Sequence, residues 1–238
     1  MTLSSDRATI AAIASAMSGT PMLSASPRDS VAALAGQGNV RRYRRGTYLF
    51  HQGDESFDLY FLWQGRVEIT SLSSTGHRQL HTALDTPQFF GELGILGSLR
   101  RTATAEALEE SMVWVVPGDV FVRFLSEHFE ATKALLKALS AQVQAEESFV
   151  EDLLFLDLKG RVAKRLLQLV SPSLDDLPED GTVLPSVVTH ADLASLSGGS
   201  RENVTRILSD FQRRKLVERD GRRYVLKNVA GLGRLAGL

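Results

Sequence analysis

The chain has 238 residues, of which 43% are hydrophobic and 23% charged, and its net charge at pH 7 is −1. This composition is ordinary for a globular protein, and the length suits two domains better than one. The absence of cysteine excludes disulfides, thiol catalysis, cysteine-ligated iron–sulfur clusters and cysteine-type zinc sites.

Residues 1–35 are rich in alanine, serine and methionine, and we interpret them as an N-terminal arm or helix. They lack the basic start and the compact apolar core of a signal peptide. No apolar run in the chain approaches the roughly 18–20 residues that a membrane span requires. We therefore expect a cytoplasmic protein with no membrane partner.

Short β-rich segments separated by glycines fill residues 36–119. Gly46, Gly53 and Gly65 fall where tight corners need a positive φ or a missing side chain. Many short strands at this spacing predict an antiparallel β-barrel or sandwich. His77 and His81, four residues apart, are interpreted as solvated hairpin residues, and no metal site is expected.

Residues 89–105, which we call the phosphate cassette, carry the most specific chemistry in the chain. The turn Gly91-Glu92-Leu93 opens a short helical segment whose first amides can face an anion. Arg101, followed by the hydroxyl of Thr102, supplies a charge-assisted clamp for phosphate. The Glu92 carboxylate is suited to accept a ribose hydroxyl, so the cassette predicts a site for a cyclic nucleotide.

A long helix is predicted over residues 120–157, because no glycine or proline occurs between Val120 and Phe155. Its apolar residues fall alternately three and four positions apart if Glu146 fills one place in the series. These residues are Leu136, Leu139, Val143, Val150 and Leu153. Such a seam predicts a helix that pairs with its copy in a homodimer; the alternative is a helix packed only on its own barrel.

Residues 158–238 show the order of a winged helix-turn-helix: helix, polar connection, helix, glycine turn, second helix and hairpin. This part holds 14 Lys and Arg against 9 Asp and Glu, whereas the rest of the chain is acidic. A basic C-terminal third favours a nucleic-acid surface. We predict a DNA-binding domain here.

The helix that follows the glycine turn carries the predicted base readers. Ser200 is a natural N-cap, and an apolar stripe for the domain core follows at Val204, Ile207, Leu208 and Phe211. The other face presents Arg201, Glu202, Thr205 and Arg206. Arginine can bind guanine bidentately and glutamate can accept from cytosine, on the turns that enter the major groove first.

Auxiliary contacts are expected at the start of the preceding helix, where Thr189 and His190 could meet phosphate. Arg213, Arg214, Lys215, Arg222 and Arg223 could do so by charge alone. The alternative is a solvated helix with a local Glu202–Arg206 ion pair.

Between about Val40 and Leu226 the chain resembles the CRP/FNR family of regulators, to which the bacterial cyclic-AMP receptor protein belongs. The resemblance implies an α+β fold with a cyclic-nucleotide-binding jelly-roll barrel, a dimerisation helix and a winged helix-turn-helix. It implies that Gly91 and Glu92 bind the ribose and that Arg101 and Thr102 bind the cyclic phosphate. Arg201, Glu202 and Arg206 would read a two-fold symmetric operator in double-stranded DNA, and the barrel's outer loops would be candidates for contact with RNA polymerase.

One departure concerns the dimer helix. Family members that respond to cyclic AMP carry small polar residues where Glu146 and Glu147 stand here. A glutamate could accept from the adenine amino group of cAMP, accept from guanine in cGMP, or pair with Arg101 in a regulator that needs no nucleotide. Ser148 could supply the hydroxyl if the register shifts by a residue.

Three other classes of protein are alternatives to this interpretation. A nucleotide-processing enzyme would need a nucleophile–base pair, a metal motif or a P-loop, and none is found, so we expect no enzymatic activity. A kinase regulatory subunit would lack the helix-turn-helix. A haem sensor on the same scaffold would need histidine or other ligands in place of cysteine.

Overall fold

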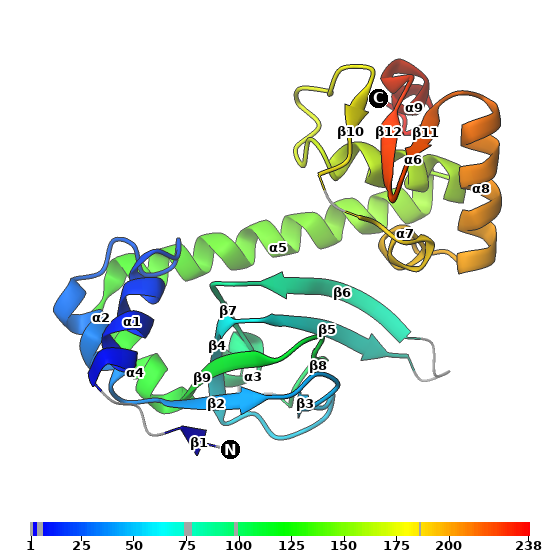
Figure 1. Ribbon diagram of the computed structural model, residues 1–238. Coiled ribbons are helices and arrows are strands. Elements are labelled where there is room, and N and C mark those ends of the chain that lie inside the picture. Colours follow the sequence, from blue (N-terminus) through cyan, green and yellow to red (C-terminus); the bar gives the residue numbers. More distant parts are fainter. Residues whose placement is uncertain (1, 4–6, 74–77, 98–99, 186) are drawn as a thin grey trace. The chain divides into compact units, whose positions relative to one another are not determined.

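The computed structural model describes residues 2–3, 7–73, 78–97, 100–185 and 187–238. The chain divides into two compact units, Met1–Gln142 and Val143–Leu238, each of which can be followed in Figure 1. The predicted two-domain α+β fold is confirmed. The boundary between the units falls inside the predicted dimerisation helix.

Two antiparallel sheets form the frame of the first unit. The larger has the order β1 (Thr2–Leu3), β2 (Asn39–Tyr43), β9 (Ser111–Pro117), β4 (Asp58–Gln64) and β7 (Gln88–Phe90); the smaller has the order β3 (Tyr48–Phe50), β8 (Thr104–Ala107), β5 (Arg66–Leu72) and β6 (Arg78–Asp85). Because strand side chains alternate between faces, Tyr60 and Leu62 of β4 join one core cluster, with residues from both sheets. Leu59 and Phe61 join a second cluster on the opposite face of β4.

The second cluster includes residues from the predicted N-terminal arm, which forms two helices, α1 (Arg7–Ser18) and α2 (Arg28–Ala35). Trp114 of β9 donates its indole N–H to the carbonyl of Ala35 at 3.0 Å. A Cβ on Gly38 would lie 2.2 Å from the same indole, so only glycine fits there. Residues 7–35 therefore belong to the first unit and contribute buried side chains to its core. His77 lies outside the described residues.

The single helix expected over residues 120–157 is divided in two. Helix α4 (Gly118–Glu127) ends before His128, whose φ of −128° and ψ of 86° are not helical, and α5 (Phe129–Phe155) begins directly after it. At the end of α4 the carbonyl of Leu125 accepts from the N–H of His128 at 3.3 Å and from the hydroxyl of Thr132 at 2.6 Å. No helix within the described ranges is long and apolar enough to cross a membrane.

The second unit contains α6 (Leu158–Gln168), α7 (His190–Ser197), α8 (Arg201–Arg213) and α9 (Val229–Leu235). A sheet of β10 (Thr182–Val183), β12 (Arg223–Leu226) and β11 (Val217–Asp220) completes it. The expected helix, glycine turn, helix and hairpin are all present. Helix α9 was not predicted; its Val229 and Leu232 lie in the same core cluster as Leu166 and Leu167 of α6.

Candidate phosphate cassette and DNA interface

Strand β7 leads directly into the phosphate cassette, where Gly91 has a φ of 84° and precedes α3 (Glu92–Leu96). A Cβ at Gly91 would lie 2.8 Å from Nη1 of Arg101. The position therefore requires glycine both for its backbone conformation and for the close approach of Arg101. Residues 98–99 of the cassette lie outside the described part of the chain.

Arg101 is only 4% exposed, although it is a cation. Its Nη1 donates to the carbonyl of Gly91 at 2.9 Å and its Nη2 to that of Asp58 at 2.6 Å. The guanidinium lies 4.4 Å from the ring centre of Phe50 and 5.1 Å from that of Tyr60. Both distances are typical of cation–π contacts.

The charge of Arg101 is not paired with a carboxylate in direct contact among the described residues. Its Nε–H is buried and has no hydrogen-bond partner. Burial lowers the pKa of this guanidinium, and the nearby Tyr60 and Asp58 partly oppose that change. A buried cation with a free donor is suited to an anionic ligand.

The other predicted cassette residues differ in burial. Burial raises the pKa of the Glu92 carboxyl, opposed by a hydrogen bond to its own backbone and by the charge of Arg101. Leu93 and Thr102 are exposed. Because α3 has only five residues, its dipole contributes little, and Arg101 supplies most of the positive charge.

Glu146 and Glu147 are exposed residues of α5 beyond the start of the second unit. Their predicted contact with the nucleotide base stays a prediction. A hollow of about 800 Å³ in the first unit is lined by other residues, among them Phe57, Ile95 and Asp119.

Helix α8, which the sequence predicts to read DNA, begins at the predicted N-cap. Gly198 closes α7 with a φ of 63°, and the Ser200 side chain caps α8 by accepting from the N–H of Asn203 at 3.3 Å. Val204, Leu208 and Phe211 are buried, and Ile207 packs against the same cluster. This fixes the apolar face of α8 toward the domain core.

The opposite face of α8 presents the expected base readers. Arg201, Glu202 and Arg206 are exposed. A hydrogen bond to its own backbone and one from Ser200 lower the pKa of Glu202, so this carboxylate is ionised at neutral pH and can accept hydrogen bonds from DNA.

Three of the other predicted DNA contacts, Thr189, His190 and Thr205, have partners within the domain. Thr189 and Asp192 form a capping box at the start of α7. His190 lies between the hydroxyls of Thr205 and Tyr224, at 2.8 Å from each. The structure thus gives His190 and Thr205 internal partners that the sequence did not predict.

A second group that sequence reasoning missed centres on Asp152 of α5, which is 3% exposed. Lys164 and Arg165 of α6 both form ion pairs with its carboxylate.

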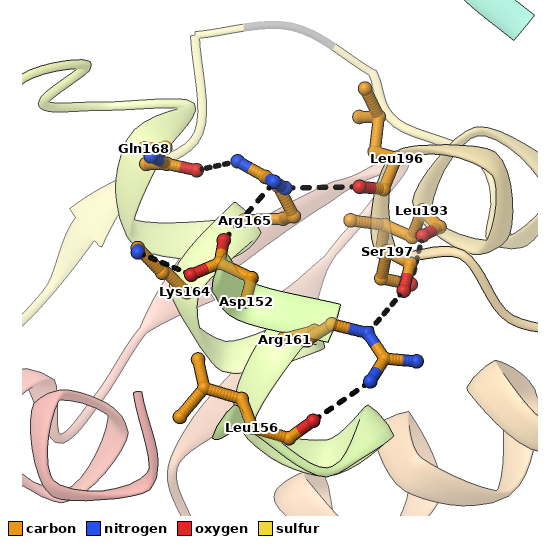
Figure 2. A network of polar contacts seen from close by, with 9 residues as sticks. All are labelled: Asp152, Leu156, Arg161, Lys164, Arg165, Gln168, Leu193, Leu196 and Ser197. Atoms are coloured by element: carbon orange, nitrogen blue, oxygen red, sulfur yellow. Dashed lines mark hydrogen bonds and ion pairs between the residues drawn. The ribbon is translucent and has the colours of Figure 1, made fainter. Parts of the chain in front are cut away.

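Arg165 also donates to the carbonyl of Leu196, and Arg161 donates to that of Ser197. Figure 2 shows that these side chains link the end of α5 to the carbonyls that precede the turn before α8. We call this group the Asp152 clamp. Its sequence signal is weak: an acid in a partly apolar helix with two cations 12 and 13 residues later.

The first unit is a two-sheet domain of the type that binds nucleotides, and a winged helix-turn-helix follows it. This combination defines a class of ligand-controlled DNA-binding regulators. Comparison with known families agrees: residues 40–128 match the cyclic nucleotide-binding domain, and residues 160–235 match the Crp-like helix-turn-helix domain. The chain belongs to the CRP/FNR family of transcription regulators.

Individual relatives are similar over most of their length. A CRP-like cAMP-activated global transcriptional regulator of Mycobacterium tuberculosis is 29% identical over 208 residues, covering 87% of this chain and 92% of the relative. The anaerobic regulatory protein of Bacillus subtilis is 28% identical over 181 residues, covering 76% of each. The crystal structure of a CRP-family transcriptional regulator from Thermus thermophilus is 26% identical with a TM-score of 0.60, covering 83% of this chain and 97% of that one.

Proposed function

We propose that this regulator is controlled by a cyclic nucleotide, with cAMP as the effector. The observation that carries the proposal is the buried Arg101, whose Nε–H has no partner and which has no carboxylate within ion-pair distance among the described residues. A cyclic phosphate would accept hydrogen bonds from this guanidinium, and Glu92 would accept from the ribose. The Mycobacterium tuberculosis relative is described as cAMP-activated.

Two alternatives to cAMP remain within the same proposal. The Bacillus subtilis relative is described only as an anaerobic regulator, so the family scaffold serves more than one signal. Glu146 or Glu147 could favour cGMP by accepting from guanine, or could pair with Arg101 so that the protein binds DNA without a nucleotide.

Calorimetry with cAMP and cGMP distinguishes these possibilities, with Arg101→Ala as the matched control. Heat with cAMP that disappears in Arg101→Ala supports the proposal. Heat with cGMP alone reassigns the effector. Absence of heat with either nucleotide, together with tight operator binding by the bare protein, refutes nucleotide control.

The regulator is proposed to act as a homodimer in the cytoplasm, without enzymatic activity. Apolar side chains on α5 support the dimer, because they remain exposed in the single chain: Leu136, Val143, Val150 and Leu153. Burying such a seam against its copy would remove them from water. Sedimentation equilibrium of Val150→Glu, which places a charge in the seam, should show monomer; an unchanged dimer would place the interface elsewhere.

On DNA, the dimer would place two α8 helices in successive major grooves about 34 Å apart. Arg201, Glu202 and Arg206 would read base edges of a two-fold symmetric operator. Ligand and DNA would raise each other's affinity by linkage. RNA polymerase is the proposed protein partner, through the outer loops of the first unit.

A further inference from the structure

His190 lies where three elements of the second unit meet. It is the first residue of α7, and its Nδ1 is 2.8 Å from Oγ1 of Thr205 on α8. Its Nε2 is 2.8 Å from the hydroxyl of Tyr224 on β12. One imidazole therefore joins the first helix of the helix-turn-helix, the DNA-reading helix and the wing.

The direction of these hydrogen bonds follows from counting hydrogens. The Thr205 hydroxyl has one hydrogen, and it donates this hydrogen to the carbonyl of Arg201 at 2.8 Å. Toward His190 the same oxygen must therefore accept, so Nδ1 carries the proton. A neutral imidazole has only one N–H, which leaves Nε2 as the acceptor for the Tyr224 hydroxyl.

The result is a one-way chain from the wing to the start of α8. The Tyr224 hydroxyl donates to His190, His190 donates to Thr205, and Thr205 donates to the Arg201 carbonyl. The imidazole and the Thr205 hydroxyl each donate one hydrogen and receive one, an arrangement in which successive hydrogen bonds strengthen one another. We call it the His190 chain.

The surroundings favour the protonation states that the chain needs. Burial lowers the pKa of His190 below its ordinary 6.5, and the positive charges of Arg219 on β11 and Arg201 on α8 lower it further. Burial raises the pKa of Tyr224, with Arg219 opposing. On His190's own helix, the Asp192 carboxylate accepts from the N–H of Thr189.

Protonation of His190 breaks the order of the chain. A second N–H, at Nε2, would point at the hydrogen that Tyr224 donates. The phenol would have to turn its hydrogen away, yet Tyr224 is only 2% exposed. Its hydroxyl would then need a new acceptor with little access to water, which is unfavourable.

We propose that His190 is a positioning residue for DNA reading: as the neutral Nδ1–H imidazole it fixes the DNA-reading helix against the wing, and it releases this contact when it takes up a proton. The chain ends on the carbonyl of Arg201, the first residue of α8, whose side chain is exposed for base contact. His190 and Thr205 thus act on DNA through Arg201 and not by touching it. This inference rests on base reading by Arg201 in the proposed function.

Protonation would have two opposite effects on DNA binding. The added positive charge strengthens binding to any sequence, whereas loss of the chain weakens the reading of particular bases. The ratio of operator affinity to random-DNA affinity separates them, because phosphate attraction contributes to both. Loss of one or two buried hydrogen bonds should lower this ratio about threefold to tenfold between about pH 7.5 and about pH 5.5.

The first test uses ¹⁵N NMR of the full chain labelled at histidine, and it needs neither operator nor effector. We expect His190 to be protonated at Nδ1 and to titrate below its ordinary 6.5. Tyr224→Phe should raise the midpoint, because it removes the donor to Nε2. Thr205→Ser keeps the hydroxyl and should retain the tautomer, whereas Thr205→Val should lose it.

Ser209→Ala is the matched control for this test, because the Ser209 hydroxyl lies on the same helix and donates to the Thr205 carbonyl at 2.9 Å, outside the chain. It should leave the tautomer and midpoint of His190 unchanged. An Nε2–H tautomer, or a midpoint that Tyr224→Phe does not move, would overturn the proposal.

The second test measures DNA reading by the full chain, on an operator selected from random DNA with and without cAMP. His190→Gln cannot take up a proton in this range, so its specificity ratio should be independent of pH, while the wild-type ratio falls in acid. A wild-type pH profile in His190→Gln would overturn the role in DNA reading. Failure to select any operator would refute base reading itself, and the NMR result would still decide the chain.

Discussion

Replacing Asp152 by asparagine tests whether the Asp152 clamp holds the second unit together. The two side chains have nearly the same shape, so the change removes a charge and little volume. The carboxylate is 3% exposed and is paired with both Lys164 and Arg165. Without it, two cations on α6 remain close together with no counterion between them.

The magnitude follows from burial. Removing one partner of a buried ion pair costs about 3–5 kcal/mol, because the other charge stays desolvated. Here the Lys164 and Arg165 side chains keep 17% and 16% of their exposure, and asparagine can still accept one hydrogen bond. We therefore expect a loss of about 2–3 kcal/mol in the free energy of unfolding of the second unit. For a domain of this size that corresponds to a fall in Tm of about 10–20 °C.

Calorimetry and hydrogen exchange of the full chain measure this loss. Exchange in α6 and α7 should accelerate, whereas tryptophan fluorescence should not change, since Trp63 and Trp114 both belong to the first unit. Glu151→Gln is the matched control, because it removes the neighbouring exposed carboxylate from the same helix. If Asp152→Asn lowers Tm no more than Glu151→Gln, the clamp does not stabilise the unit.

Four further substitutions test the two sites. Gly91→Ala places a side chain on a residue with a φ of 84° and close to Arg101. It should lower the stability of the first unit by about 1–3 kcal/mol, measured by tryptophan fluorescence during denaturation, and it should weaken nucleotide binding. Because the folded-state pKa of Glu92 is raised from 4.5, its contribution to stability is present below 4.5 and lost as pH rises through the folded pKa. Glu92→Gln should therefore reduce the fall in first-unit stability between pH 4.5 and neutrality, and an unchanged slope would contradict the burial argument. Arg201→Ala should cost about 1–3 kcal/mol of operator affinity and relax specificity at one base position. Arg222→Ala on the wing should instead weaken binding to all DNA sequences alike and reduce the salt dependence of binding by about one unit of slope. Equal effects of the two changes on selectivity would refute base reading by Arg201.

The two-domain fold was predictable from the sequence because local residue patterns indicate its strands and helices. Short β segments between glycines predicted the sheets of the first unit. The apolar spacing of Val204, Leu208 and Phe211 predicted which face of α8 is buried. Chain order then left few arrangements compatible with these elements. The break between α4 and α5 at His128 was not predicted, because no glycine or proline marks it. The hydrogen bond from the Thr132 hydroxyl to the Leu125 carbonyl has no sequence pattern either.

By itself the sequence determined which face of α8 carries Arg201, Glu202 and Arg206, and it predicted which residues would bind a phosphate. Only the tertiary structure decided how Arg101 is held, by the carbonyls of Gly91 and Asp58, with Nε–H left free. It likewise decided that His190 serves Thr205 and Tyr224. The physical reason is the same in both cases: backbone carbonyls are present at every residue, and hydroxyls 15 and 34 positions away become partners only when folding brings their elements together.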